Sequence, residues 1–308
     1  MSALAETGAV EGAVVAARPE TPLRRFLADY FESRIATGAF AVLLGIVFIA
    51  VFAPWISPTD PYDLAVVDIM DNRLPPGSES YTGITYWLGT DGAGRDLLSA
   101  IFYGLRTSLI VGLASGLISM VIGASIGFIA SYFCGRTYTI IMRIVDVQLS
   151  FPAILVALIL LAILGRGVDK IIVALVAVQW AYYARTVRAS ALVERRKEYV
   201  EAATCLALSH SRILFKHVLP NCLPPLIVVV TVQTAHAISL EATLSFLGIG
   251  LPVTEPSLGL LIANGFEYML SLKYWISFFP GIALLVTIVS INLVGDQLRD
   301  VLNPRLQR

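Results

Sequence analysis

Long stretches without a charged residue alternate along the chain with short charged segments. Six stretches lack Asp, Glu, Lys and Arg, namely 35–59, 107–135, 147–165, 171–184, 217–240 and 274–295. A helix needs about 20 mostly apolar residues to cross the hydrocarbon core of a bilayer. Five stretches reach this length or nearly so, and the fourth can cross if Lys170 and Arg185 extend toward the lipid head groups. The pattern predicts an all-α polytopic membrane protein with six transmembrane helices.

The composition narrows the class of protein further. Charged residues make up 14% of the 308 residues, whereas soluble domains contain about 25%. Lys plus Arg and Asp plus Glu both number 22, so the net charge is zero and no overall basic field for nucleic acid exists. We therefore expect membrane lipid and no nucleic acid as partner. The chain is interpreted as a partly disordered cytoplasmic segment, 1–34, followed by one transmembrane domain, 35–308.

The distribution of Lys and Arg orients the predicted helices. If the N-terminus lies in the cytoplasm, sixteen of the 22 basic residues fall on the cytoplasmic side and six on the opposite side. Cytoplasmic loops of membrane proteins carry an excess of Lys and Arg, so both termini are predicted to be cytoplasmic. Residues 1–34 lack the pattern of a cleaved signal peptide, and the first apolar stretch is interpreted as an uncleaved anchor.

Motifs for nucleotide chemistry or hydrolysis are missing. The sequence has no G-x-x-x-x-G-K-[ST] phosphate loop, no H-E-x-x-H zinc motif and no G-x-S-x-G nucleophile motif. The Gly-rich stretch 89–96 follows no predicted strand, which disfavours a nucleotide-binding role. The three histidines and three cysteines do not have metal-ligand spacing. We therefore expect no catalytic residue, no metal and no cofactor in this chain, and do not expect it to be an enzyme.

Two ionisable residues, His236 and Glu241, belong to the fifth predicted helix or its outer end. Ionisable groups in a membrane are costly to bury and usually functional, so one interpretation is a proton relay. The other is that Glu241 makes a structural contact inside the helix bundle near the outer surface. The second is preferred, because one carboxylate and one imidazole make a sparse relay.

The cytoplasmic loop at about 185–222 is the most informative segment. Residues 190–216 include no Gly or Pro and many helix formers, so one or two helices are predicted there. Ala202, Ala203 and Ala207 place small side chains at helical spacing, which lets another surface approach the backbone closely. The loop is therefore either an amphipathic linker held by anionic lipid or a docking site for a soluble partner.

Part of this loop resembles a known motif. The residues concerned are Glu201, Ala202, Ala203, Ala207, Leu219 and Pro220. They are similar to the EAA loop of permease subunits of ATP-binding-cassette (ABC) importers, with Ala207 where that family usually has Gly. The resemblance implies the type I ABC importer permease fold, in which a cytoplasmic coupling helix docks in a cleft of an ATPase. Leu219–Pro220 is expected to end the helix, and a bulky residue at 203 or a lysine at 201 is expected to uncouple ATP hydrolysis from transport.

Further motifs narrow the family. An outer-loop signature consists of Gly89, Thr90, Asp91, Gly94, Arg95 and Asp96. With segments 103–109, 150–152, 240–248, 295–300 and 303–305, this signature is similar to the C-type permease of dipeptide, oligopeptide and nickel importers. The resemblance covers roughly 35–308. It implies a complex in the bacterial inner membrane with a second homologous permease, two ATP-binding subunits that hold ATP and Mg, and an external solute-binding protein.

Four glycines share one face of the second predicted helix. Gly112, Gly116, Gly123 and Gly127 are spaced by four, seven and four residues. Small residues at such spacing allow close helix contact. The contact is either within this chain or with the partner permease, and the sequence supports both interpretations equally.

The first outer loop has an acidic character. Its acidic residues include Asp60, Asp63, Asp68, Asp71 and Glu79. They either keep the loop solvated or form a docking surface for the solute-binding protein. Charge reversal at 68 and 71 would test the docking hypothesis.

These observations predict a permease subunit of an ATP-driven importer for di- or oligopeptides, which forms half of the translocation path. A nickel or peptide-like opine importer is an alternative within the same family. A proton-coupled secondary transporter is an alternative of another class and predicts uptake by this chain alone. A membrane enzyme or scaffold has no supporting motif.

Overall fold

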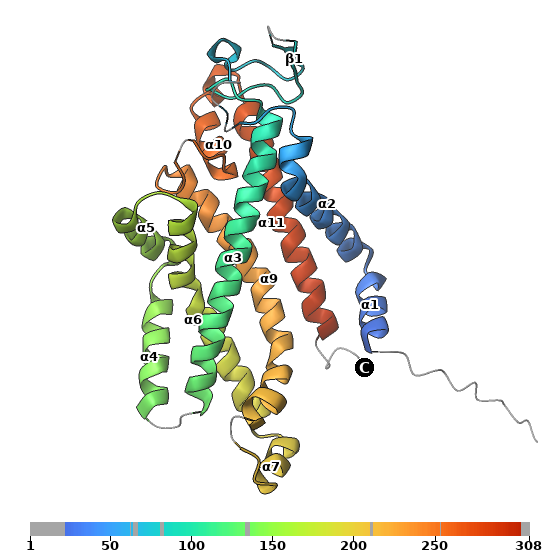
Figure 1. Ribbon diagram of the computed structural model, residues 1–308, viewed down its shortest axis with the longest axis vertical. Coiled ribbons are helices and arrows are strands. Elements are labelled where there is room, and N and C mark those ends of the chain that lie inside the picture. Colours follow the sequence, from blue (N-terminus) through green and yellow to red (C-terminus); the bar gives the residue numbers. More distant parts are fainter. Residues whose placement is uncertain are drawn as a thin grey trace, which may run out of the picture.

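The computed structural model describes residues 22–61, 63, 67–80, 83–132, 136–209, 212–252 and 254–302. These residues form a bundle of long helices with an irregular loop segment at one end (Figure 1). The predictions made for residues 1–21 and for the terminal motif at 303–305 lie outside the described residues.

Helices account for most of the described chain. They are α1 (Pro22–Glu32), α2 (Arg34–Ile56), α3 (Leu97–Tyr132), α4 (Arg136–Ser150), α5 (Ala153–Leu164), α6 (Val168–Glu194), α7 (Glu198–Cys205), α9 (Leu219–Phe246), α10 (Leu258–Phe266) and α11 (Trp275–Leu302). Shorter elements are the 3₁₀ turns η1 (Ile69–Asp71) and η3 (Met269–Ser271), the π-helical turn η2 (Ile213–Val218), and the antiparallel strand pair β1 (Ser78–Glu79) and β2 (Thr85–Tyr86).

Fewer membrane spans are supported than the six predicted. Four helical segments of the described chain are long and apolar enough to cross a membrane: Arg34–Ile56, Leu97–Ser131, Ile213–Phe246 and Trp275–Leu302. A fifth is added if Tyr138–Ser150 and Ala153–Leu164, which meet at an angle of 91°, form one broken span. The predicted stretch 147–165 therefore contains a sharp bend rather than a straight helix.

The predicted stretch 171–184 lies within α6, which is not among the candidate spans. With 27 residues, α6 is about 40 Å long, which is enough to cross a bilayer. Its apolar part is short, because charged residues stand near both ends, including Lys170, Arg185 and Arg188. The prediction of six transmembrane helices is therefore not confirmed.

The centre of the bundle is formed by α3, α6 and α9. An apolar cluster that includes Leu161, Leu175 and Leu244 joins α5, α6 and α9. A second cluster joins α3, α6, α7 and α9, with Phe128 and Val187 among its members. Lipid tails are as apolar as these side chains, so close van der Waals packing stabilises the contacts between helices inside a membrane. The helices that carry the predicted site residues are thus packed against one another.

The two described ends of the chain lie close together. The side-chain amide of Gln297 donates to the backbone oxygen of Asp29 at 3.4 Å, and Val301 packs against Tyr30 and Ala36. In Figure 1, α7 lies at the bottom of the bundle, whereas β1 and α10 lie near the top. Residues 57–96, called here the 57–96 loop, connect α2 to α3 at that upper end.

Candidate functional site

The helix α7 contains the predicted motif residues Glu201, Ala202 and Ala203. Val200 and Ala203 are 6% and 5% exposed and pack against side chains of α6, η2 and α9. Glu201 and Ala202 are exposed on the other side of the helix. One face of α7 is therefore fixed to the bundle, and the other face is uncovered by the described residues of this chain.

A hydrogen-bond network ties α7 to α6 and α9. The hydroxyl of Tyr199 donates to Glu194 Oε2 at 2.6 Å and accepts from Asn221 Nδ2 at 3.1 Å. Lys197 Nζ pairs with Glu194 Oε1 at 2.6 Å. Burial and the hydrogen bond to Glu194 raise the pKa of Tyr199 to about 12. A displacement of α7 must therefore move the adjoining ends of α6 and α9.

Glu194, Tyr199 and Asn221 were missed by the sequence analysis. The motif directs attention to residues 201–203, whereas these three lie on either side of it. The available signal was the residue type, because the polar end of a partly buried tyrosine usually finds a hydrogen-bond partner. Their partners could be identified only once the end of α6 and the start of α9 were placed together.

The three alanines do not form the predicted strip for close approach. Ala203 faces the apolar core, Ala202 faces outward, and Ala207 lies beyond the end of α7. A bulky residue at position 203 would overpack this chain's own core. Loss of coupling in such a variant would therefore not report on docking alone, whereas Ala202 and Ala207 are exposed.

The Leu219–Pro220 pair begins a helix instead of ending one. Pro220 lies in the first turn of α9, which continues through Pro224 and Pro225 to Phe246. Prolines lack a backbone donor, and the wider π-helical turn η2 immediately precedes them. The predicted helix end is thus wrong, and the irregularly bonded stretch is part of a continuous helical segment.

Ala207 has a backbone conformation that favours glycine. Its φ is 54°, in the left-handed region. The N–H of Leu208 donates to the oxygen of Ala203 at 3.2 Å, and the N–H of Ala207 donates to that of Thr204 at 2.9 Å. These two hydrogen bonds form a Schellman motif, a helix C-terminus in which the residue with left-handed backbone is usually Gly. A glycine at this position would suit the left-handed backbone of the turn.

We predict that Ala207→Gly stabilises the loop. The substitution removes the penalty of a left-handed alanine, about 1–2 kcal/mol, part of which is offset by the greater freedom of glycine in the unfolded chain. The midpoint of thermal unfolding of the purified chain should rise. The matched change Ala202→Gly, inside α7, should lower it, since glycine costs about 1 kcal/mol in a helix. A lower midpoint for Ala207→Gly would contradict the assignment.

At the other end of the bundle, glycines let the 57–96 loop fold back on itself. Gly89 and Gly94 have φ of 82° and 84°. A Cβ atom would lie 2.4 Å from the Leu74 oxygen at the first and 2.3 Å from the Asp68 oxygen at the second. Thr90 Oγ1 accepts the Leu74 N–H at 2.7 Å. The glycines are required for the turn, and no phosphate cradle is needed to explain them.

The charged residues of the signature fix the same turn. Arg95 Nε donates to Asp91 Oδ2 at 2.8 Å, with side chains only 8% and 1% exposed. Asp91 Oδ1 also accepts the backbone N–H groups of Ala93 and Arg95. Asp96 Oδ2 accepts the N–H of Ser99 at 2.9 Å and thereby caps the start of α3. These contacts join the turn to the start of α3.

Asp71 does not belong to the solvated acidic surface that was predicted for this loop. Its side chain is fully buried, and Oδ2 accepts hydrogen bonds from Ser80 at 2.5 Å and Tyr86 at 3.1 Å. The acidic residues Asp60, Asp63, Asp68 and Glu79 are exposed. Charge reversal at position 71 would disrupt the loop itself, so it cannot test docking.

The four glycines of α3 lie at helix contacts within the chain. A Cβ atom at Gly112 or Gly116 would meet Ile238 or Thr234 of α9, at 2.7 and 3.1 Å. A Cβ atom at Gly123 or Gly127 would meet backbone oxygens of α6, at 2.2 and 2.6 Å. Of the two interpretations of this face, the structure therefore shows packing against α6 and α9.

We predict that Gly123→Ala destabilises the chain by about 1–3 kcal/mol, because the new methyl group must displace backbone of α6. Gly45→Ala on α2 is the matched control, since nothing lies within 4 Å of a Cβ there. This control should be neutral or stabilising by up to about 1 kcal/mol. The midpoint of thermal unfolding, followed by helical circular dichroism, measures both. Equal midpoints for the two variants would contradict the close contact.

Glu241 and His236 are in different surroundings. Glu241 is fully buried and accepts hydrogen bonds from Ser108 of α3 at 3.0 Å and Ser245 at 2.8 Å. His236 is exposed on α9, and no described interaction joins it to Glu241. The carboxyl group therefore links α3 to α9. Within the described residues, no group of three His, Cys, Asp or Glu could hold a metal ion.

Two known protein families match this chain. Residues 120–308 match the family described as binding-protein-dependent transport system inner membrane component. Residues 21–76 match the N-terminal transmembrane domain of oligopeptide transport permease C. The chain belongs to this permease family. The larger match includes α7 and the two helices that contact it, α6 and α9. Both faces of α7 therefore lie in the part of the chain that matches the family.

Relatives resemble this permease over most of its length. A putative peptide transport system permease protein of Brucella suis is 44% identical over 266 residues, which is 86% of either chain. The di/tripeptide transport system permease protein DppC of Pseudomonas aeruginosa is 37% identical and covers 93% of either chain. The dipeptide transport system permease protein DppC of Escherichia coli is 37% identical, covering 94% of this chain and 95% of its own length.

Among solved structures, the fold resembles a chain of the MetNI methionine ABC transporter in inward-facing conformations. The TM-score is 0.56, with 20% sequence identity. The match covers 67% of this permease and 98% of the other chain. At this identity the likeness shows the fold alone, which is that of an ABC importer permease.

Proposed function

We propose that this permease forms half of the translocation path of an ATP-driven importer for di- or oligopeptides. We further propose that it receives the ATP-driven movement through α7. The observation that carries the proposal is the attachment of α7, whose inner face is packed and whose Tyr199 is bonded to α6 and α9. A helix held in this way passes a displacement to its neighbours as a rigid element. The exposed face, with Glu201 and Ala202, remains for the ATPase.

The peptide class rests on the relatives, which are named as peptide, di/tripeptide and dipeptide permeases and match nearly the whole chain. Proton-coupled transport by this chain alone has less support, because His236 is exposed while Glu241 is buried and bonded to two serines. The sequence has no phosphate loop, which supports the proposal that separate subunits bind ATP and Mg.

The proposal includes a placement in the membrane and a set of partners. The bent pair α4–α5 and α6 serve as the third and fourth of six spans, and the α7 end faces the cytoplasm with both termini. The partners are a second homologous permease, two ATP-binding subunits and an external solute-binding protein. The exposed acids of the 57–96 loop are a candidate contact for that binding protein, with Asp71 excluded because it is buried.

Reconstituted transport tests the proposal. The permease, its partner permease, the ATP-binding subunits and the binding protein are placed in liposomes, and uptake of labelled Gly-Leu is measured. Uptake should require enclosed ATP and every subunit. Uptake by this chain alone, or uptake driven by a proton gradient without ATP, would contradict the ATP-driven mechanism. Uptake of nickel but not of peptide would contradict the substrate class.

A further inference from the structure

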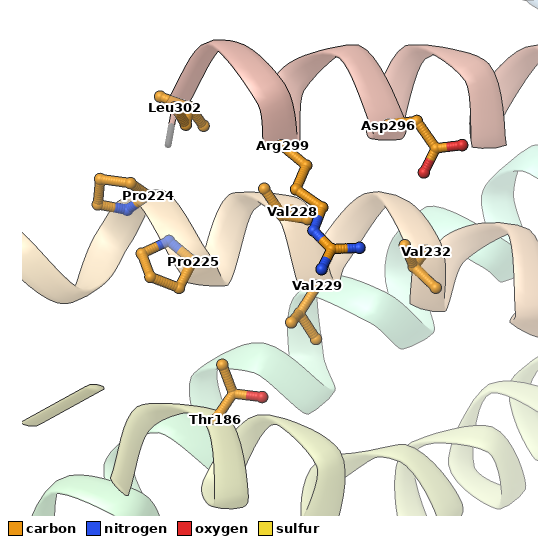
Figure 2. Close-up of a pocket in the computed structure, with 9 residues that line it drawn as sticks. All are labelled: Thr186, Pro224, Pro225, Val228, Val229, Val232, Asp296, Arg299 and Leu302. Atoms are coloured by element: carbon orange, nitrogen blue, oxygen red, sulfur yellow. The ribbon is translucent and has the colours of Figure 1, made fainter. Parts of the chain in front are cut away.

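A pocket of about 490 Å³ opens between α6, α9 and α11 (Figure 2). Its residues are Thr186, Pro224, Pro225, Val228, Val229, Val232, Asp296, Arg299 and Leu302. Thr186 belongs to α6, and the others come from the half of α9 that begins beside α7 and from the last turns of α11. The pocket therefore lies in the part of the bundle nearest α7, which is the proposed cytoplasmic half.

The pocket combines an apolar floor with two opposite charges. In Figure 2, Asp296 and Arg299 project from α11 on the side that faces α9, and the guanidinium of Arg299 reaches toward Val229. Both charged side chains are exposed, and neither takes part in an ion pair with a described residue. Residues three apart on a helix commonly pair when their charges are opposite. Here both groups remain available to a ligand.

We propose that this pocket binds zwitterionic peptides on their way to the cytoplasm, with Arg299 taking the terminal carboxylate and Asp296 the terminal ammonium. The proposal rests on the proposed function and names a substrate contact within the path. Guanidinium–carboxylate hydrogen bonds are among the stronger polar contacts in proteins. The valines and prolines of α9 contact the peptide's side chains without selecting among them.

The dimensions agree with a short peptide. The Cα atoms of Asp296 and Arg299 are separated by about 4.5 Å along the helix axis. The ends of an extended dipeptide lie roughly 7 Å apart, a span that two flexible side chains can bracket. Pockets of about 300–1,000 Å³ hold small ligands. The lining contains no His, Cys or Met, so it does not suit a nickel ion, which prefers nitrogen or sulfur ligands.

Photolabelling tests the pocket directly. The importer, assembled in lipid nanodiscs without its binding protein, is irradiated with Gly-photoleucine, a dipeptide that carries a diazirine. Mass spectrometry should place the label on residues 224–232 or 296–302. Excess Gly-Leu should suppress labelling, whereas N-acetyl-Gly-Leu-amide, which lacks both charges, should not. Labelling elsewhere, or equal competition by the blocked peptide, would overturn the proposal. Occupation of the pocket by a lipid head group that excludes the probe would also overturn it.

Charge variants provide the second readout. Asp296→Asn and Arg299→Gln should each reduce labelling by at least about fivefold, the loss expected for one charge-assisted contact. Asp300→Asn is the matched control, because Asp300 is exposed on the same helix but does not line the pocket. Unchanged labelling in the first two variants would overturn the assignment of the termini.

Gly-Leu uptake by the unmodified importer, measured in parallel, separates the two proposals. Uptake without labelling of the pocket overturns the inference alone. Absence of Gly-Leu uptake overturns the proposed function and the inference with it.

Discussion

The Ala202→Trp variant is expected to assemble in the membrane but to lose ATP-driven peptide uptake by at least about tenfold. Ala202 is exposed on α7 beside Glu201, so an indole ring there would keep the ATPase surface away from the helix. A loss of about 1.4 kcal/mol in docking free energy already corresponds to a factor of ten. Stimulation of ATPase activity by the loaded binding protein should fall in parallel with uptake.

The neighbouring alanine is the control for this result. Ala203→Trp places the same ring in the apolar core, where overpacking costs about 1–3 kcal/mol, and should lower the thermal stability of the isolated chain. Ala202→Trp should leave that stability unchanged. Normal ATPase stimulation in Ala202→Trp would show that α7 is not the contact.

The charge of α7 is tested by the Glu201→Lys variant, which should also uncouple ATP hydrolysis from uptake. Glu201 is exposed, so reversing its charge changes the surface offered to the ATPase without disturbing the core. Glu32→Lys provides the matched control, because Glu32 is exposed on α1, far along the chain from α7. Normal coupling in Glu201→Lys, or equal loss in Glu32→Lys, would remove the role assigned to this carboxylate.

Removing the carboxylate of Asp91 is expected to open the 57–96 loop. The Asp91–Arg95 pair is almost fully buried, and loss of one partner of such a pair costs about 3–5 kcal/mol. Arg73 packs over the ring of Tyr268 in the closed loop. Because proteolysis follows the population of the open form, trypsin cleavage after Arg73 should accelerate by roughly a hundredfold or more in Asp91→Ala.

Two further variants serve as an intermediate case and a control for that prediction. Asp91→Asn keeps an acceptor for the backbone N–H groups but loses the charge, so its cleavage rate should fall between those of the wild type and Asp91→Ala. Asp68→Asn changes an exposed acid of the same loop and should leave the rate nearly unchanged. A similar rate in all variants would mean that the buried pair does not hold the loop closed.

Charge-free stretches located the helical segments of the membrane domain but not their path. The apolar run that contains Ser150–Pro152 gave no measure of the 91° turn between α4 and α5. The short stretch 171–184 predicted where α6 lies in the sequence. It did not predict how far α6 is buried, because α3 and α9 cover it. An apolar composition indicates that a segment is shielded from water. It does not show whether lipid or protein shields it.

Local motifs indicated which residues matter more reliably than why they matter. The spacing of the four α3 glycines predicted close packing, but only the placement of α6 and α9 identified the partner helices. Ala203 and Asp71 were given surface roles because small or acidic residues in loops usually face water, and tertiary packing buried both. The glycine expected at position 207 became understandable from a backbone angle that no motif records.

The central claim, that a separate ATPase moves this permease through α7, is tested most directly by a photocrosslink from Cys205. This cysteine is exposed at the end of α7, whereas Cys222 is buried and unreactive by comparison. In a Cys134→Ser background, a maleimide carrying a diazirine is attached at Cys205 in native membranes and irradiated with and without ATP. The account predicts a crosslinked product with a P-loop ATPase whose yield changes with ATP. A labelled permease that transports peptide but gives no ATPase product in either state would contradict it.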